Sequence, residues 1–226
     1  MKTEHLLIIR FSAMGDVAMT VPVIYSLAQQ YPQLRISVLS RPYAQAFFEN
    51  LAPNVDFMAA DLKHEYRKIR GLNKLYRRLT AKQFTAVADF HDTLRSKYLR
   101  MRFFMDRFKV AHIDKHRSEK RELIHHQNKV LKPIQSAFQN YADVLSELGY
   151  PIKLNFNSIF PTNNEAFTSL IPKIGNYKEN EKWIGLAPFA AHTGKIYPLT
   201  QMEQTLQGLL KKYPTARLFL LSLIHI

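Results

Sequence analysis

The hydrophobic pattern along the chain alternates between short apolar runs and segments with helical spacing. Leu6–Ile9 is wholly apolar and has the length of a strand that is buried on both faces. From Val17 onward, apolar residues recur every three or four positions, which predicts a helix. Residues 10–16 between them contain a serine, a glycine and an aspartate and predict a turn. The chain therefore opens with strand, tight loop and helix, the beginning of a βαβ unit.

The same alternation continues through the first 150 residues. Further strands are predicted at 35–40, 55–58, 84–90 and 109–113. Helices are predicted at 42–51, 65–79, 94–104 and 136–148, and the charged segment 117–121 is predicted to be a loop. Strands and helices in this order favour a parallel sheet with right-handed crossovers. In such sheets ligands bind at the carboxyl ends of the strands.

A second α/β unit is predicted near the end of the chain. The periodicity is lost after Gly149, in a stretch that contains several prolines, asparagines and lysines. An apolar strand follows at 183–187, then a helix opened by Thr200, with Glu203 completing a capping-box pattern, and a strand at 217–223. We therefore expect an N-terminal domain at 1–165, a linker at 166–182, and the start of a C-terminal domain at 183–226.

Composition narrows the class of protein. The 226 residues are 46% hydrophobic, enough for a substantial core. There is no cysteine, which excludes disulfides, thiolate metal sites and cysteine nucleophiles and fits a reducing cytoplasm. No signal peptide is visible, and no apolar run approaches the ~20 residues of a membrane span. We therefore expect a globular cytoplasmic protein.

The formal net charge of +14 indicates an anionic partner. Lysines and arginines cluster at 63–82, 95–109 and 115–121. Phosphorylated substrates, an anionic membrane surface and nucleic acid all fit this charge, and a merely solvated surface is the alternative for any one cluster. No nucleic-acid-binding motif is recognisable, so we expect no nucleic-acid partner. The helix at 65–79 is apolar on one side and basic on the other, which suits either packing on the sheet or contact with anionic lipid.

The histidines do not predict a metal site. His112 and His116 have the spacing of a helical ligand pair, but they lie in a cationic segment without a strong helix signal or a third ligand. We expect no bound metal.

Asp16 is the residue of greatest interest in the first loop. At a helix start, an aspartate accepts backbone N–H bonds as an N-cap. At the mouth of the ligand crevice, the same carboxylate could serve as a general base. The single glycine of this loop excludes a dinucleotide fingerprint, which needs three. The residues alone leave both roles of Asp16 open.

Three stretches resemble motifs of glycosyltransferase family 9, the heptosyltransferases of lipopolysaccharide core assembly. The first loop and helix match the pattern R-x-S-x-x-G-D followed by T-x-P, with Arg10, Ser12, Gly15, Asp16, Thr20 and Pro22. The strand end at 89–96 resembles D-x-H followed by R-S, with Asp89, His91, Arg95 and Ser96. The loop Phe189–Pro198 resembles the family loop that ends in K-x-Y-P.

The resemblance implies a GT-B fold, in which two Rossmann-like, doubly wound parallel-sheet α/β domains face each other. It implies an inverting glycosyltransferase that moves a heptose or related sugar from a nucleotide-sugar donor, ADP-heptose by analogy, to a lipopolysaccharide core or lipid A-type glycolipid. Relatives need no tightly bound metal, and no cofactor is expected. The implied location is cytoplasmic, peripheral to the inner membrane.

The resemblance also assigns residues. Asp16 would deprotonate the acceptor hydroxyl. The residues assigned to acceptor binding are Arg10, Ser12, Gly15, His91 and Arg95. The donor phosphates would be bound by Thr193, Gly194 and Lys195. Better-studied members carry hydroxyl residues where this chain has Ala190 and Ala191. The phosphate contacts would then depend on backbone groups, Thr193 and Lys195.

The second domain is expected to be truncated, because the family's base and ribose pocket would lie beyond residue 226. A chain without that pocket could instead be a non-catalytic peripheral binder of anionic glycolipid or membrane. A basic nucleic-acid-binding protein is the remaining alternative, and it predicts a steep salt dependence of binding.

Overall fold

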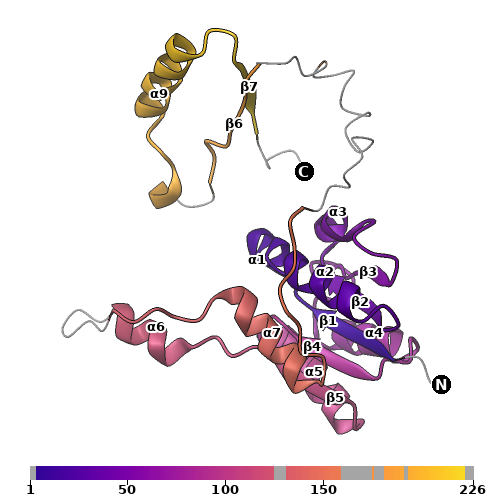
Figure 1. Cartoon of the computed structure of the whole chain (residues 1–226). Coiled ribbons are helices and arrows are strands. Elements are labelled where there is room, and N and C mark those ends of the chain that lie inside the picture. The colour runs from indigo at the N-terminus through magenta and orange to yellow at the C-terminus, as the bar shows by residue number, and fades with distance from the viewer. Residues whose placement is uncertain (1–3, 125–130, 159–174, 176–180, 191–192, 222–226) are drawn as a thin grey trace. The chain divides into compact units, whose positions relative to one another are not determined.

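The computed structural model describes residues 4–124, 131–158, 175, 181–190 and 193–221. The chain divides into two compact units, Met1–Ile159 and Phe160–Ile226. Each unit is described by itself (Figure 1).

The first unit is built on a five-stranded parallel sheet. Its strands are β1 (His5–Ile9), β2 (Arg35–Ser40), β3 (Val55–Ala59), β4 (Ala86–Asp89) and β5 (Lys109–His112). Their order is β3-β2-β1-β4-β5, and every pairing is parallel. The predicted parallel sheet is therefore confirmed. The strand order reverses between β1 and β4, and such a switch point places a ligand crevice at their carboxyl ends.

Helices cover both faces of this sheet. They are α1 (Met14–Ala18), α2 (Val21–Gln30), α3 (Gln45–Phe48), α4 (Ile69–Thr80), α5 (Leu94–Met105) and α7 (Ala137–Glu147), with a 3-10 turn η1 at Pro42–Ala44. Helix α6 (Arg117–Ile124) has no buried residue and extends away from the sheet (Figure 1). Successive side chains of β1 point to opposite faces. Leu6 and Ile8 pack in the layer of α1, α2 and α7, while Leu7 and Ile9 pack in the layer of α4 and α5. The unit is therefore a three-layer sandwich with β1 in its centre.

Three sequence predictions about helix bounds are wrong. The charged segment 117–121 is helical, because its Glu, Lys and Arg residues are good helix formers and His116 Nδ1 lies 3.0 Å from Glu119 Oε1 across its first turn. The helix predicted at 65–79 begins only at Ile69. Thr200 does not cap its helix, because that helix begins at Leu199, directly after Pro198.

Gly71 in α4 is required by a close backbone contact. A Cβ atom at this position would lie 2.7 Å from the Glu65 carbonyl oxygen and 2.7 Å from Tyr66 Cα. The segment before α4 thus folds back across the helix at its glycine, and Tyr66 is buried there. The glycine permits a packing contact, although glycine normally weakens a helix.

Gly71→Ala is therefore expected to destabilise the first unit by about 1–3 kcal/mol, because overpacking outweighs the better helix propensity of alanine. The matched control is Gly208→Ala in the second unit, where a Cβ atom would meet nothing within 4 Å. We expect that change to stabilise its helix by about 0.5–1 kcal/mol. Urea unfolding followed by far-UV circular dichroism measures both. A stabilised Gly71→Ala variant would contradict the contact.

The second unit is a β-α-β element. β6 (Trp183–Leu186) pairs in parallel with β7 (Arg217–Leu220), with Trp183 opposite Arg217. The 3-10 turn η3 (Thr193–Lys195) and α9 (Leu199–Lys212) connect the two strands. Most of the predicted linker 166–182 lies outside the described residues, as does 222–226, so the domain bounds stay predictions. In the described part of the chain, no helix combines the length and the apolar character needed to cross a membrane.

Candidate active site

The loop that follows β1 lies at the switch point of the sheet. Arg10 and Phe11 come directly after β1, and Phe90 and His91 come directly after β4, its neighbour. The Arg10 N–H donates to the Leu39 carbonyl and the Phe90 N–H donates to the Ile9 carbonyl, so the sheet pairing continues to the start of both loops. The residues that the sequence singled out from both stretches are thus brought to one edge of the sheet.

Asp16 is the third residue of α1, whose N-cap is Ala13. Of the two roles left open for Asp16, the N-cap is therefore excluded, although its Oδ2 accepts a hydrogen bond from the Ala13 N–H at 3.2 Å, from inside the first turn. Oδ2 also lies 2.6 Å from Arg10 Nη2. The side chain is 51% exposed, and Oδ1 has no hydrogen-bond partner among the described residues. Asp16 is thus a fixed carboxylate with one oxygen open to a substrate.

Arg10 holds this carboxylate from behind. Arg10 is only 8% exposed, and its Nη1 donates to the Phe90 carbonyl at 2.7 Å while Nη2 pairs with Asp16. Its guanidinium therefore joins the loop after β1 to the loop after β4. Gly15 lies beside Asp16 in α1 with open space around it. The structure places Arg10 behind Asp16. The acceptor-binding role that the family resemblance implies for Arg10 stays a prediction.

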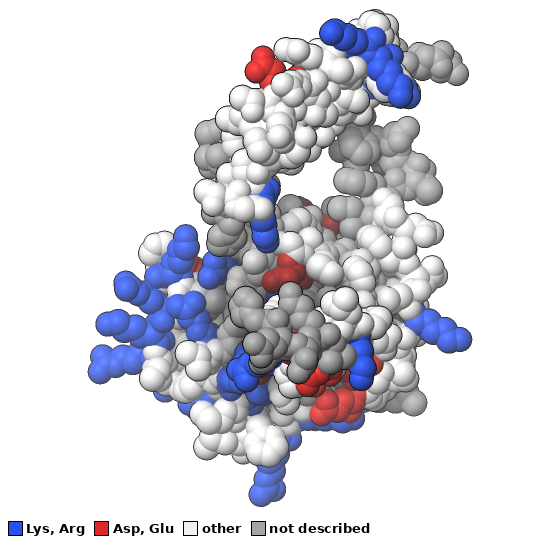
Figure 2. Space-filling view, turned by 90° about the vertical axis from the view of Figure 1, so that its left-hand side faces the viewer, with Lys and Arg blue, Asp and Glu red and all other residues white. Residues whose placement is uncertain are grey.

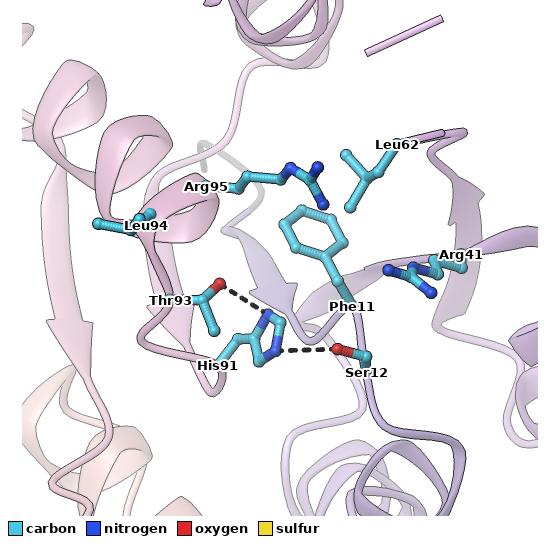
Figure 3. Close-up of a pocket in the computed structure, with 8 residues that line it drawn as sticks. All are labelled: Phe11, Ser12, Arg41, Leu62, His91, Thr93, Leu94 and Arg95. Carbon is cyan, nitrogen blue, oxygen red and sulfur yellow. Dashed lines mark hydrogen bonds between the residues drawn. The ribbon is translucent and has the colours of Figure 1, made fainter. Parts of the chain in front are cut away.

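A hollow of about 470 Å³ lies at the carboxyl ends of the strands (Figure 3). We call it the hollow, and its lining residues are Phe11, Ser12, Arg41, Leu62, His91, Thr93, Leu94 and Arg95. They come from the segments after β1, β2, β3 and β4. Of the predicted acceptor-binding residues, the structure brings three to the hollow: Ser12, His91 and Arg95.

His91 is fixed in the wall of the hollow by two hydroxyl groups. Its Nε2 lies 3.3 Å from Ser12 Oγ and its Nδ1 lies 3.2 Å from Thr93 Oγ1 (Figure 3). Burial, together with the nearby charges of Arg10 and Lys115, lowers the pKa of His91 to about 4. The ring is therefore neutral at pH 7, and it can offer a hydrogen bond without adding charge.

This lowered pKa makes the stability of the first unit depend on pH. The unfolded chain binds a proton at His91 below pH 6.5, whereas the folded state resists it until about pH 4. We therefore expect stability to fall as the pH drops from 6.5 towards 4, and His91→Gln to remove part of that slope. Urea unfolding across this pH range measures it, with the exposed His112→Gln as the control. An unchanged slope in His91→Gln would contradict the neutral buried ring.

Positive charge surrounds the hollow. Arg41 and Arg95 reach towards it from opposite sides, and neither has a carboxylate within ion-pair distance in the described part of the chain (Figure 3). Lys115 lies nearby, where its Nζ donates to the Asp92 carbonyl at 2.9 Å and burial lowers its pKa. By contrast, Arg100 is paired with Asp89 and Asp92. The hollow is therefore suited to an anionic group.

Sequence reasoning missed Arg41 and Lys115. Arg41 directly follows the carboxyl end of β2, so the crevice rule that selected His91 and Arg95 applies equally to it. Lys115 belongs to the third basic cluster, and its proximity to His91 depends on the position of β5 beside β4. Only the strand order shows that Lys115 lies near His91.

The predicted donor-phosphate residues lie in the second unit. Thr193, Gly194 and Lys195 form the exposed turn η3, closed by a hydrogen bond from the Ile196 N–H to the Thr193 carbonyl. Ala191 lies outside the described residues, and Ala190 is exposed. The phosphate role of this turn remains a prediction.

The described residues contain no group of three or more His, Cys, Asp or Glu side chains that could hold a metal ion. His125 and His126 lie outside the described residues. His116 bonds to Glu119 and Asn140, and the ion pair with Glu119 raises its pKa.

Solved structures share this architecture. The glycosyltransferase family 9 protein from Veillonella parvula matches 97% of this chain with a TM-score of 0.68 and 18% sequence identity. The heptosyltransferase WaaC from E. coli, solved with ADP-2-deoxy-2-fluoro heptose, matches 98% with a TM-score of 0.65 and 19% identity. The fold is that of glycosyltransferase family 9. This likeness confirms the predicted GT-B class.

The likeness to family 9 is one of fold. The chain spans 63% of the length of the Veillonella protein and 70% of WaaC. A UDP-GlcNAc 2-epimerase from Methanocaldococcus jannaschii shares the architecture more distantly, with a TM-score of 0.52 and 16% identity over 96% of this chain. No protein-family model and no curated protein matches the sequence.

Proposed function

We propose that this protein is an inverting glycosyltransferase that moves a heptose or related sugar from a nucleotide-sugar donor to a phosphorylated glycolipid. ADP-heptose is the first donor to test, and a lipopolysaccharide core or lipid A-type glycolipid is the first acceptor. The observation that carries the proposal is Asp16, a carboxylate held by a buried arginine at the switch point of a family 9 fold. Asp16 also stands in the R-x-S-x-x-G-D motif, to which the family resemblance assigns the base.

In the proposed reaction, Asp16 Oδ1 accepts the proton of the acceptor hydroxyl. The hydroxyl oxygen then attacks the anomeric carbon, and the bond from that carbon to the donor diphosphate breaks. Its electron pair leaves with the nucleoside diphosphate. Arg10 orients Asp16 through its contact with Oδ2. A single displacement of this kind inverts the anomeric configuration.

The acceptor is proposed to place an anionic group in the hollow. Arg41 and Arg95 supply its charge, and neutral His91 and Ser12 supply hydrogen bonds. On the donor side, Lys195, Thr193 and the Gly194 N–H are proposed to bind the diphosphate and stabilise its developing charge. No metal or cofactor is needed in this scheme.

The proposed location is the cytoplasmic surface of the inner membrane. The net charge of +14 and the cationic hollow support an anionic glycolipid as partner. The sequence contains no recognisable nucleic-acid-binding motif. The remaining candidate is a non-catalytic binder of the same glycolipid, which the cationic hollow would suit equally.

The test is an assay of the full chain with ADP-heptose and a phosphorylated lipid A-type acceptor. We expect a glycosylated product by mass spectrometry and ADP release that depends on the acceptor. Acceptor binding without product or ADP release would instead support the non-catalytic binder. Binding of neither substrate would reject both.

A further inference from the structure

Helix α5 carries apolar side chains on two opposite faces. Leu99 and Phe103 are fully buried against the sheet. On the outer face, Leu94, Met101 and Met105 are 88%, 50% and 67% exposed, and the adjacent Phe104 is 68% exposed. We call these four residues the α5 stripe. A helix at a protein surface normally presents polar residues to water, so this face is built for contact with something apolar.

Exposed cations border the α5 stripe. α4 packs beside α5 through Asn73, whose Oδ1 accepts hydrogen bonds from the Tyr98 hydroxyl at 2.7 Å and from Arg102 Nη1 at 2.6 Å. Arg70 and Arg77 of α4 are exposed, two helical turns apart, and Arg107 is exposed just after α5. These three arginines have no carboxylate within ion-pair distance among the described residues. Figure 2 shows Lys and Arg side chains crowded on one side of the molecule.

The stripe begins at the rim of the hollow. Leu94 and Arg95, in the first turn of α5, both line the hollow, and the stripe continues from Leu94 along the helix to Met105. A molecule with an anionic head and an apolar tail would therefore meet a cationic hollow and an apolar helix face in sequence.

We propose that the protein binds an anionic lipid surface through the α5 stripe together with Arg70, Arg77 and Arg107, which we call the lipid-binding surface. The stripe enters the apolar region below the headgroups, and the arginines contact the anionic headgroups. The proposal rests on the proposed function in one respect. The lipid-binding surface would hold the glycolipid headgroup at the hollow while the acyl chains of the glycolipid stay in the lipid layer.

Charge argues against a second copy of the chain as the occupant. In a two-fold symmetric contact the same patch faces itself, so the arginines around the stripe would meet arginines. Like charges in contact oppose association, whereas an anionic lipid surface satisfies both the apolar stripe and its border.

The test measures binding of the full chain to sedimented vesicles of phosphatidylglycerol and phosphatidylcholine, and to vesicles of phosphatidylcholine alone. We expect binding to the anionic vesicles that weakens in high salt. Replacing both Phe104 and Met105 by serine is expected to lower that binding about tenfold or more. The matched control replaces Ile124 and Leu131 by serine, because these side chains of the first unit are 76% and 84% exposed but lie outside α5.

A second pair of variants tests the charged border. Arg70→Glu with Arg77→Glu is expected to lower binding to anionic vesicles, while Lys120→Glu with Arg121→Glu on α6 makes the same change of charge away from the stripe. Equal losses in test and control variants would overturn the proposal. So would a full chain that binds no vesicles, or a stripe variant that converts a dimer into a monomer in analytical ultracentrifugation.

The experiments distinguish failure of the lipid-binding proposal from failure of the transferase proposal. The vesicle assay contains no sugar donor, and Asp16→Asn should bind vesicles like the native chain because Asp16 lies outside the stripe. Vesicle binding without sugar transfer would support the lipid-binding surface and reject the transferase proposal.

Discussion

Asp16→Asn is expected to lower the rate of sugar transfer by about 10²–10⁴-fold, the usual contribution of a positioned general base. Asparagine retains the shape of the side chain and an oxygen that can face Arg10, but it cannot accept the acceptor proton. Acceptor binding should remain, because the hollow is lined by other residues. The measurement is the transfer rate at saturating donor and acceptor, with acceptor affinity determined separately.

Asp56→Asn is the matched control for this prediction. Asp56 pairs with Arg35 at 2.7 Å and its side chain is 52% exposed, close to the 2.6 Å of the Arg10–Asp16 contact and the 51% exposure of the Asp16 side chain. It lies on β3, away from the hollow. If both variants lost activity equally, loss of a half-exposed carboxylate's contact with an arginine would explain the result and the role of Asp16 as base would be rejected.

Phe103→Ala is expected to destabilise the first unit by about 3–5 kcal/mol. Phe103 is fully buried, with its ring edge-on to Tyr76 at 4.9 Å and to Phe108 at 5.1 Å. Removing the ring leaves a cavity between α4, α5 and the sheet that these aromatic neighbours cannot fill. Because small domains are stable by only about 5–15 kcal/mol, the change should be evident in urea unfolding followed by circular dichroism.

The neighbouring Phe104→Ala variant is the control for that experiment. Phe104 is exposed and belongs to the α5 stripe, so we expect a stability change within about 0.5 kcal/mol. The sole tryptophan, Trp183, lies in the second unit, so its fluorescence separately reports whether that unit is intact. Equal destabilisation by both substitutions would mean that α5 presents a different face to the sheet.

The central strand of the sheet was predictable because residues 6–9 are wholly apolar. A run such as Leu6–Ile9 has few alternatives to a strand buried on both faces, and the loop after it falls at a carboxyl end by geometry alone. That rule also places the side chains after β4 near those after β1. The general position of the site therefore follows from strand order and chain direction.

Other features depend on contacts that no local pattern contains. The sequence left an N-cap open for Asp16 because the apolar repeat starts only at Val17, whereas α1 begins at Met14 and Arg10 binds Asp16 from outside the helix. In α5, Leu99 and Phe103 are buried while Leu94, Met101 and Met105 are exposed. These two sets are equally apolar, so hydrophobicity alone does not indicate which face packs on the sheet.

The central position of β1 gives the candidate site, Asp16 together with the hollow, a fixed side and an adjustable side. Asp16 and Arg10 are attached to the strand that both apolar layers enclose. Arg41, Leu62 and Leu94 lie on segments that follow β2, β3 and β4 and are joined to Asp16 by no direct contact. Under the proposed function, substitutions at these three positions are therefore expected to alter which acceptor fits without displacing Asp16. In such a scaffold, acceptor preference can diverge between related proteins while the reaction chemistry is inherited unchanged.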